Sequence, residues 1–135
     1  MPLNLEFEFW YLDEPEIGLR LRSPDTGRDV FTSAILDTGA DVSLFDDLLA
    51  NQLGIDLSRA RSIPFRGIGG QTMEARQANV EVILLEEPDL SASVTLAFSP
   101  RQTLILGILI GLDVLAHFDF GLSHRDRLGY LGRPS

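Results

Sequence analysis

The sequence contains no cysteine and no lysine, and both absences limit its chemistry. Without cysteine there is no thiol nucleophile, no disulfide and no metal bound through sulfur. Without lysine there is no Schiff-base mechanism and no phosphate-loop lysine; all 11 basic residues are arginine. The Gly-x-Ser-x-Gly pattern of many serine hydrolases is also missing. Several common classes of enzyme are therefore excluded.

Positive charge and long apolar segments are also scarce. The 20 acidic residues outnumber the basic ones and give a net charge of −9, which disfavours nucleic acid or an anionic membrane as a partner. The longest apolar stretch, Leu104 to Leu112, contains two glycines and is much shorter than the roughly 20 residues that span a bilayer. The first 12 residues carry two glutamates and no basic residue, unlike a signal peptide. We expect a soluble, cytoplasmic protein.

The length of 135 residues and the 44% hydrophobic content predict one domain, residues 1–135. Alternating apolar and polar residues predict short strands, broken by turns rich in glycine, proline and aspartate. These strands are expected at residues 3–9, 19–22, 30–36, 61–66, 72–85, 94–98, 118–120 and 128–131. Asp46 or Asp47 is expected to cap a short helix that Gly54 stops, and a second helix is expected from Leu112 to about His117. Many strands with one or two short helices predict an all-β fold, a closed β-barrel.

The triplet Asp-Thr-Gly occurs twice, at Asp25 and at Asp37. The first copy lies in Ser23–Arg28, where proline, aspartate and glycine together are typical of a hairpin turn, so we predict a solvated turn. The second copy follows the apolar residues 34–36 and precedes Ala40. A carboxylate carried into apolar surroundings is costly unless it is paired or neutralised. Residues 37–39 are therefore either a structural turn or a site with an unusual acid.

Two further segments allow a structural and a functional interpretation. Gly67-Ile68-Gly69-Gly70 is either a flexible hairpin turn or a mobile flap, because glycine backbones can close over a bound chain. The segment from Leu109 to Leu115 has the pattern apolar-apolar-Gly-x-Asp-x-Leu. By itself this pattern indicates a buried strand that enters a helix.

In this order and at these intervals, the three segments resemble those of the retropepsins, the single-domain aspartic proteases of retroviral type. The resemblance extends from about Leu19 to Leu131 and is strongest over Ala34–Asp41, with Ser43 where the family favours serine or threonine. The hairpin expected over Phe118–Leu131 is more similar to prokaryotic and cellular members than to viral ones. The resemblance implies the retropepsin type of closed β-barrel.

The resemblance also implies roles for the matched positions. Asp37 would be the catalytic carboxylate, Thr38 would bond to its mate across a two-fold axis, and Gly39 would permit close approach. Gly111 would pack beside the active-site loop. The expected substrate-binding residues are Ala40, Asp41, Gly67, Ile68, Gly69 and Gly70. Val42, Leu44 and Ile110 are expected to line the pockets for substrate side chains.

One position departs from the family pattern. Many retropepsins have an arginine after the glycine of the third segment, where it pairs with the aspartate that matches Asp41. Leu112 occupies that position here. Asp41 must therefore find another partner, and Arg66 or backbone amides are the candidates.

Hydrolysis of this kind uses two carboxylates that share one proton, and the chain offers only one suitable triplet. The sequence therefore predicts a homodimeric aspartic endopeptidase with a peptide or protein substrate, and with no cofactor or metal. A non-catalytic dimer that clamps an extended peptide is the alternative. A metal enzyme that uses His117 and His124 is less well supported, because these histidines are seven residues apart, one in an expected helix and one in a loop.

Overall fold

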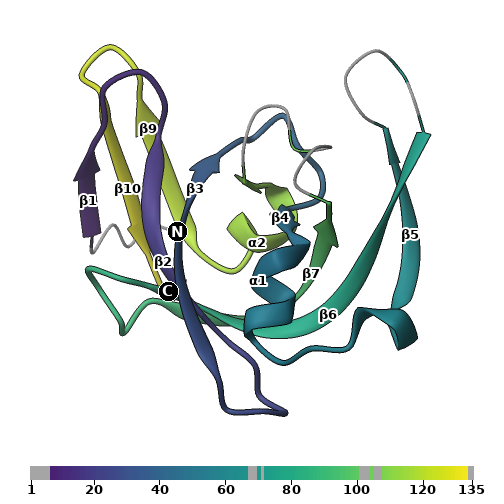
Figure 1. Ribbon diagram of the computed structural model, residues 1–135. Coiled ribbons are helices and arrows are strands. Elements are labelled where there is room, and N and C mark those ends of the chain that lie inside the picture. The colour runs from purple at the N-terminus through teal and green to yellow at the C-terminus, as the bar shows by residue number, and fades with distance from the viewer. Residues whose placement is uncertain (1–6, 67–69, 71, 101–103, 105–107, 134–135) are drawn as a thin grey trace.

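A computed structural model describes residues 7–66, 70, 72–100, 104 and 108–133 of the chain. Strands account for most of this structure, together with two short helices and one 3-10 turn (Figure 1). The all-β prediction is confirmed. Gly67, Ile68 and Gly69 of the expected flap lie outside the described residues.

Seven strands form the main sheet, in the order β2-β3-β8-β4-β7-β6-β5. Strand β2 also pairs with β6 over residues 19–22, so the first six strands of this order close into a ring and β5 lies at its edge. This ring agrees with the predicted closed architecture. The strands are β2 (Glu16–Arg22), β3 (Asp29–Leu36), β4 (Leu44–Asp46), β5 (Arg61–Arg66), β6 (Thr72–Leu84), β7 (Ser91–Ser99) and β8 (Leu109–Ile110).

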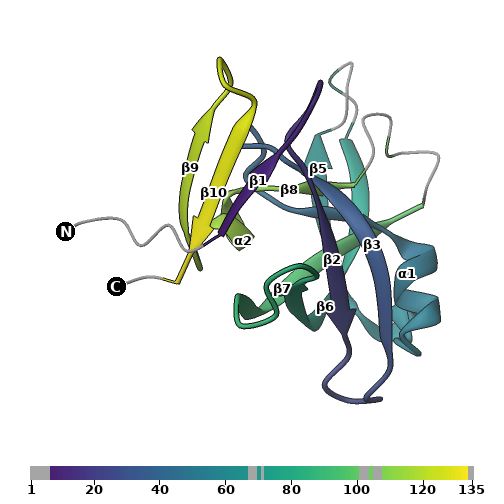
Figure 2. The same cartoon turned by 90° about the vertical axis from the view of Figure 1, so that its left-hand side faces the viewer.

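A separate three-stranded sheet joins the two ends of the described chain (Figure 2). Its central strand, β10 (Leu128–Gly132), pairs with β9 (Asp119–Ser123) on one side and with β1 (Phe7–Trp10) on the other. The β9–β10 hairpin was predictable from its alternation, but the pairing of β1 with β10 was not. Gly129 lies opposite Phe9, and a Cβ at this position would overlap the Phe9 ring. Only glycine allows the aromatic ring to cross β10 here.

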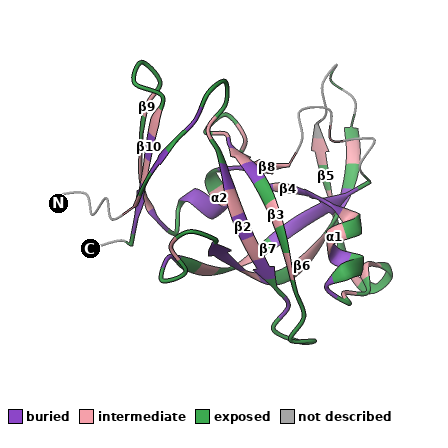
Figure 3. Cartoon of the chain, turned by 60° about the vertical axis from the view of Figure 1, so that its left-hand side comes forward, coloured by how far each residue is buried: buried purple, intermediate pink, exposed green. Residues whose placement is uncertain are grey.

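The apolar residues of the alternating strands face inward and form one core, whereas the tips of the β2–β3 and β9–β10 hairpins are exposed (Figure 3). The rings of Phe45 and Phe98, from the paired strands β4 and β7, pack at a tilt with their centroids 6.3 Å apart. Each of these fully buried aromatic side chains stabilises the fold by roughly 3 kcal/mol relative to exposure. The largest fully buried side chains also include Leu19, Leu21, Leu53, Leu90, Leu96, Ile110 and Leu131.

Helix α1 (Asp47–Gln52) follows β4 directly and has the predicted ends. The Asp46 carboxylate caps it by accepting a hydrogen bond from the Leu48 amide at 3.0 Å. Gly54 has a φ of +75°, the left-handed conformation that commonly ends a helix. Ala50 and Leu53 are buried against the core, so α1 covers one end of the ring.

The β2–β3 hairpin ends in the first triplet, as the turn pattern predicts. The Ser23 amide donates to the Arg28 carbonyl at 2.9 Å, and Gly27 has a φ of +73°. Thr26 has a contact that the sequence did not reveal: its hydroxyl donates to the Leu53 carbonyl at 2.6 Å. The turn is therefore attached to the end of α1 and is not merely a solvated loop.

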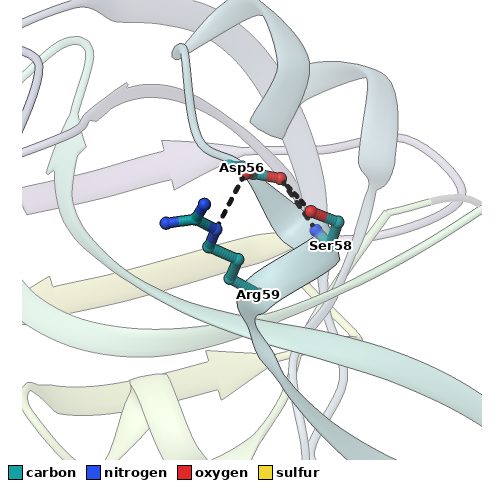
Figure 4. Close-up of polar contacts among 3 residues, drawn as sticks. All are labelled: Asp56, Ser58 and Arg59. Atoms are coloured by element: carbon teal, nitrogen blue, oxygen red, sulfur yellow. Dashed lines mark hydrogen bonds and ion pairs between the residues drawn. The ribbon is translucent and has the colours of Figure 1, made fainter.

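A short 3-10 turn, η1 (Leu57–Arg59), connects α1 to β5 and begins at Asp56 (Figure 4). The Asp56 carboxylate accepts hydrogen bonds from the Ser58 hydroxyl at 2.6 Å and from the Ser58 amide at 3.0 Å. The hydroxyl bond is the main cause, and the amide bond the second, of a pKa of Asp56 below its ordinary value. The Arg59 guanidinium lies 3.9 Å away.

Candidate active site

Asp37 lies immediately after β3, where the pairing of β3 with β8 holds the chain. β3 pairs in parallel with β8, and β8 pairs with β4 at Leu44. The Asp37 amide donates to the Ile110 carbonyl at 2.8 Å, which continues the β3–β8 pairing by one residue. The loop of residues 37–43 is thus attached at both ends to one short, partly buried strand.

The Asp37 carboxylate is half-buried, and one of its oxygens is held in place. Its Oδ1 accepts a hydrogen bond from the Gly39 amide at 2.8 Å. Among the described residues, the carboxylate has no other protein partner. The second oxygen is therefore available to a ligand, a water molecule or another carboxylate.

Gly39 and Thr38 form the exposed tip of this loop. A Cβ at Gly39 would lie 3.1 Å from the Asp37 Oδ1, a distance tighter than most real Cβ contacts. Glycine therefore lets the amide approach the carboxylate. The role expected for Thr38 involves a second copy of the chain and stays a prediction.

Gly111 packs against the loop, as expected from its place in the third segment. A Cβ on Gly111 would lie 2.5 Å from the Ala40 carbonyl oxygen and 3.0 Å from the Val42 carbonyl carbon. The next residue, Leu112, donates its amide to the same Ala40 oxygen at 2.8 Å. The start of helix α2 (Leu112–Leu115) therefore touches the backbone that follows Asp37.

Ser43 and Asp113 form a hydrogen-bond network that the sequence analysis missed. The Asp113 Oδ1 accepts bonds from the Ser43 amide at 2.9 Å, the Ser43 hydroxyl at 2.6 Å and the Val114 amide at 2.8 Å. The Ser43 hydroxyl oxygen in turn accepts from the Gly111 amide at 2.8 Å, and Ser43 is fully buried. A small hydroxyl residue after the triplet and an aspartate after Gly111 were the available signals. Bonds to a carboxylate are stronger than neutral ones, so the network ties the loop to α2.

Asp41 is exposed, and its backbone carbonyl accepts a bond from the Asp113 amide at 3.3 Å. Its carboxylate has no hydrogen-bond or ion-pair partner among the described side chains. The expected partner Arg66 has a side chain outside the described part of the structure. Leu112, in the position of the family arginine, is 44% exposed. The loop and the start of α2 therefore present an acid and an apolar side chain at the surface.

In Figure 1, β5 ends and β6 begins on the same side of the molecule as the C-terminal end of β3. The register of the β5–β6 hairpin pairs Arg66 with Thr72, so residues 67–71 form the connection. Gly70, the one flap glycine among the described residues, is exposed and has a φ of +81°. This conformation strains other residue types and explains a glycine at this position.

Of the three side chains expected to line substrate pockets, two are at least partly exposed and one is buried. Val42 is 37% exposed, and Leu44 is half-buried. Ile110 is only 2% exposed and belongs to the core, so the expectation that it lines a pocket is wrong. The cause is that Ile110 lies on the face of β8 that packs into the core, whereas Leu109 on the opposite face is half-buried.

The two histidines have separate surroundings. His117 follows α2 and is exposed, whereas His124 stacks beside Tyr11, with its Nδ1 3.1 Å from the Tyr11 hydroxyl. In the described part of the chain, no three histidine or acidic residues are grouped so as to hold a metal ion. Within the same residues, no helix is long and apolar enough to cross a membrane.

Comparisons with known proteins agree with this geometry. A family model described as retroviral aspartyl protease matches residues 12–123. The crystal structure of a retropepsin-like aspartic protease from Rickettsia conorii is similar, with a TM-score of 0.57 and 19% identity over 91% of this chain and 94% of that chain. At this identity the structural likeness shows the fold alone. No match is found among curated proteins. Because the family model spans most of the sequence, the chain belongs to the retroviral aspartyl protease family.

Proposed function

We propose that the protein is an aspartic endopeptidase, formed by a homodimer in which the two copies of Asp37 meet at one shared site. The observation that carries this proposal is the half-buried Asp37 carboxylate, with Oδ1 held by the Gly39 amide and no other described partner. Family membership supports the same chemistry. In this proposal residues 1–135 form one retropepsin-like domain that needs no cofactor.

The second carboxylate must come from another chain, because the first triplet is too far away. Asp25 lies in the turn before β3, and Asp37 follows the end of that strand. Eight extended residues span about 26 Å. Asp25 is also in the turn that is attached to α1 through Thr26. A two-fold axis beside the exposed residues Thr38 and Gly39 would instead bring two copies of Asp37 together.

The paired carboxylates would act as one acid–base unit. Two like charges about 3 Å apart cannot both ionise easily, so the pair shares a proton. The ionised member takes a proton from water, and the protonated member donates to the scissile carbonyl oxygen as the water attacks. No covalent intermediate is needed, and the two titrations belong to the pair rather than to either residue.

The substrate is proposed to be an extended peptide held between the loop after Asp37 and the β5–β6 hairpin. Ala40 and Asp41 follow Asp37 directly and are half-buried and exposed, respectively. The segment from Gly67 to Gly70 would cover the peptide from the opposite side. Main-chain hydrogen bonds would then supply affinity, and pockets for alternate side chains would supply specificity.

Cleavage of a diverse peptide library by the wild type and by Asp37→Asn, from about pH 3 to pH 8, tests the proposal. The wild type should cut, and Asp37→Asn should not. A mixing experiment tests the shared site. If each active unit needs two copies of Asp37, an equal mixture equilibrated before assay should retain about one quarter of the wild-type activity, whereas independent monomers would retain about one half.

Sedimentation at the assay concentration provides the control. A dimer is expected, and a pure monomer that still cuts would overturn the shared site. Asp25→Asn, mixed with the wild type in the same way, should leave the activity unchanged, because Asp25 lies outside the proposed site.

A non-catalytic peptide clamp is the second candidate, and the surroundings of Asp41 favour it. The family arginine is replaced by Leu112, and the Asp41 carboxylate has no described partner. If the protein is a clamp, the wild type and Asp37→Asn should bind extended peptides with equal affinity. Neither protein should cut them at any pH.

A further inference from the structure

Strand β1 has one free edge among the described strands. The alternation of its hydrogen bonds with β10 shows which backbone groups face that edge. The Tyr11 amide donates to the Arg127 carbonyl at 3.1 Å, so Tyr11 and Arg127 form a hydrogen-bonded pair in the β1–β10 register. Such pairs alternate along antiparallel strands, so Phe9 and Phe7 also bond toward β10. The backbone groups of Glu8 and Trp10 therefore point away from β10. Among the described strands, β1 pairs with β10 alone.

The free edge of β1 faces the beginning of β2 across a cavity of about 300 Å³. Figure 2 shows β1 between β10 and β2. The opposite wall contains Glu16, Ile17 and Gly18. The Leu36 amide donates to the Pro15 carbonyl, so by the same alternation Glu16 and Gly18 direct their backbone groups away from β3. Gly18 uses its carbonyl for the Leu85 amide, and Glu16, which lies beyond the β2–β6 pairing, donates its amide to the Glu14 carbonyl at 2.8 Å.

The walls of this cavity carry negative charge. Glu8, Glu16 and Glu86 line it, and a second hollow of about 380 Å³ shares Trp10 and Glu16 with it. Asp13 and Glu14 line the second hollow. No basic residue is among the described residues that line either one. This surface therefore favours a cationic ligand over an anionic one.

Two large apolar side chains line this surface: Trp10 lines both hollows, and Leu12 lines the second. Trp10 is 72% exposed and Leu12 is 86% exposed. An exposed tryptophan beside carboxylates suits a guanidinium or ammonium group, which the aromatic face attracts while the carboxylates bind it. An unpaired strand edge suits an extended backbone, because its amides and carbonyls can continue the sheet.

We propose that the free edge of β1 and the cavity between β1 and β2 form a docking site for a basic, extended segment of a partner protein. The segment adds to the three-stranded sheet beside Glu8 and Trp10. Its basic side chains face Glu8, Glu16 and Glu86 and stack on Trp10. Residues 37–41 do not line this surface, so docking there goes beyond the proposed hydrolysis and does not depend on it.

Trp10 is the only tryptophan of the chain, so its fluorescence reports occupation directly. The probe is an acetylated peptide of about eight residues that alternates arginine and valine, and the control peptide has glutamate in place of arginine. Both are titrated into Asp37→Asn protein, so that hydrolysis cannot consume them. The arginine peptide should bind at least about tenfold more tightly, and its binding should weaken as salt is added.

Variants separate this surface from the overall charge of the protein. Glu8→Gln with Glu86→Gln should weaken binding about fivefold, whereas Asp25→Asn with Glu81→Gln, which changes the net charge equally, should change it less than about twofold. Glu16 is left intact because it accepts a bond from the Ser33 hydroxyl. Equal losses in the two double variants would overturn the proposal.

Hydrogen exchange then locates the bound strand. The Glu8 and Trp10 amides should exchange more slowly in the presence of the arginine peptide, because they become bonded to it. A peptide bound in the proposed active site would instead protect the loop after Asp37 and leave β1 unchanged. That result, or protection of the Glu8 and Trp10 amides in the peptide-free protein that is lost on dilution to monomer, would refute docking of a basic segment at this edge.

Discussion

The two Asp-Thr-Gly triplets are identical in sequence and different in structure. The first lies in an exposed hairpin turn, where Thr26 bonds to the end of α1 and Gly27 supplies a positive φ. The second follows the buried end of β3, where Asp37 is half-buried and bonded to the Gly39 amide. In the first copy the threonine has the clearest structural contact, whereas in the second copy it is the aspartate.

The difference shows that the residues packed around a triplet, rather than the triplet itself, make it a candidate active site. Around the second copy, Gly111 packs on the loop backbone, and Asp113 bonds to Ser43. Around the first copy, a Cβ on Gly27 would meet nothing within 4 Å. The second triplet is thus held by two other segments of the chain. Substitutions in one triplet at a time test this distinction.

The largest expected effect is on cleavage. Asp37→Asn should reduce kcat/KM by about a thousandfold or more, since an amide can neither share the proton nor activate water. Asp25→Asn should change kcat/KM less than about twofold. Initial rates on one peptide that the wild type cuts provide the measurement. A comparable loss in both variants would contradict the distinction between the triplets.

The next largest effect is on packing. Gly111→Ala should lower the free energy of unfolding by about 3 kcal/mol, because its methyl group meets the Ala40 carbonyl and the backbone must move. Gly27→Ala should cost about 1 kcal/mol, from the positive φ alone. Urea denaturation of both variants checks the ranking. The reverse order would show that the loop after Asp37 adapts easily.

The next effect in size on the free energy of unfolding is expected from removal of the buried Ser43 hydroxyl. Ser43→Ala should cost about 2 kcal/mol, because it leaves the Gly111 amide without its acceptor and removes one bond to Asp113. Asp113→Asn keeps an oxygen acceptor and should cost less. Thermal unfolding of the two variants gives the difference. Equal stability of Ser43→Ala and the wild type would show that the network does not hold the loop.

A smaller effect is expected at the first triplet. Thr26→Val should cost about 1 kcal/mol, since it removes the hydroxyl bond to the Leu53 carbonyl and keeps the shape of the side chain. Thr32→Val is the control, because the Thr32 hydroxyl makes only a long, exposed contact of 3.5 Å. Chemical denaturation should separate the two variants, and cleavage should stay at the wild-type rate in both.

The smallest effect concerns Asp56, which resembles Asp37 in accepting a bond from the amide two residues later. Its pKa is below the ordinary value because of the Ser58 hydroxyl and amide bonds. The linked stability is therefore present above the ordinary pKa of about 3.9 and is lost as the pH falls through the lowered value. Ser58→Ala should move the pKa of Asp56 back toward the ordinary value. An NMR titration of its carboxyl carbon measures this, and an unchanged pKa would argue against the hydroxyl as its cause.

Much of the fold was predictable because its signals are local. Alternation of apolar and polar residues predicted β5 and most of β3 and β6, and Asp46 and Gly54 predicted the ends of α1. Strand β4 was missed because three residues are too few to show a period. The pairing of β1 with β10 was missed because it joins segments more than 100 residues apart.

The candidate acid, the glycines beside it and the likeness to the family can be read from the chain alone, because they depend on residue types and their order. The way in which the loop after Asp37 is held depends on tertiary contacts, since Ser43, Gly111 and Asp113 come together from different segments of the chain. The tertiary structure also removed Ile110 from the surface and left the edge of β1 free among the described strands. Burial and edge exposure depend on which distant strands pair, and no local pattern contains that information.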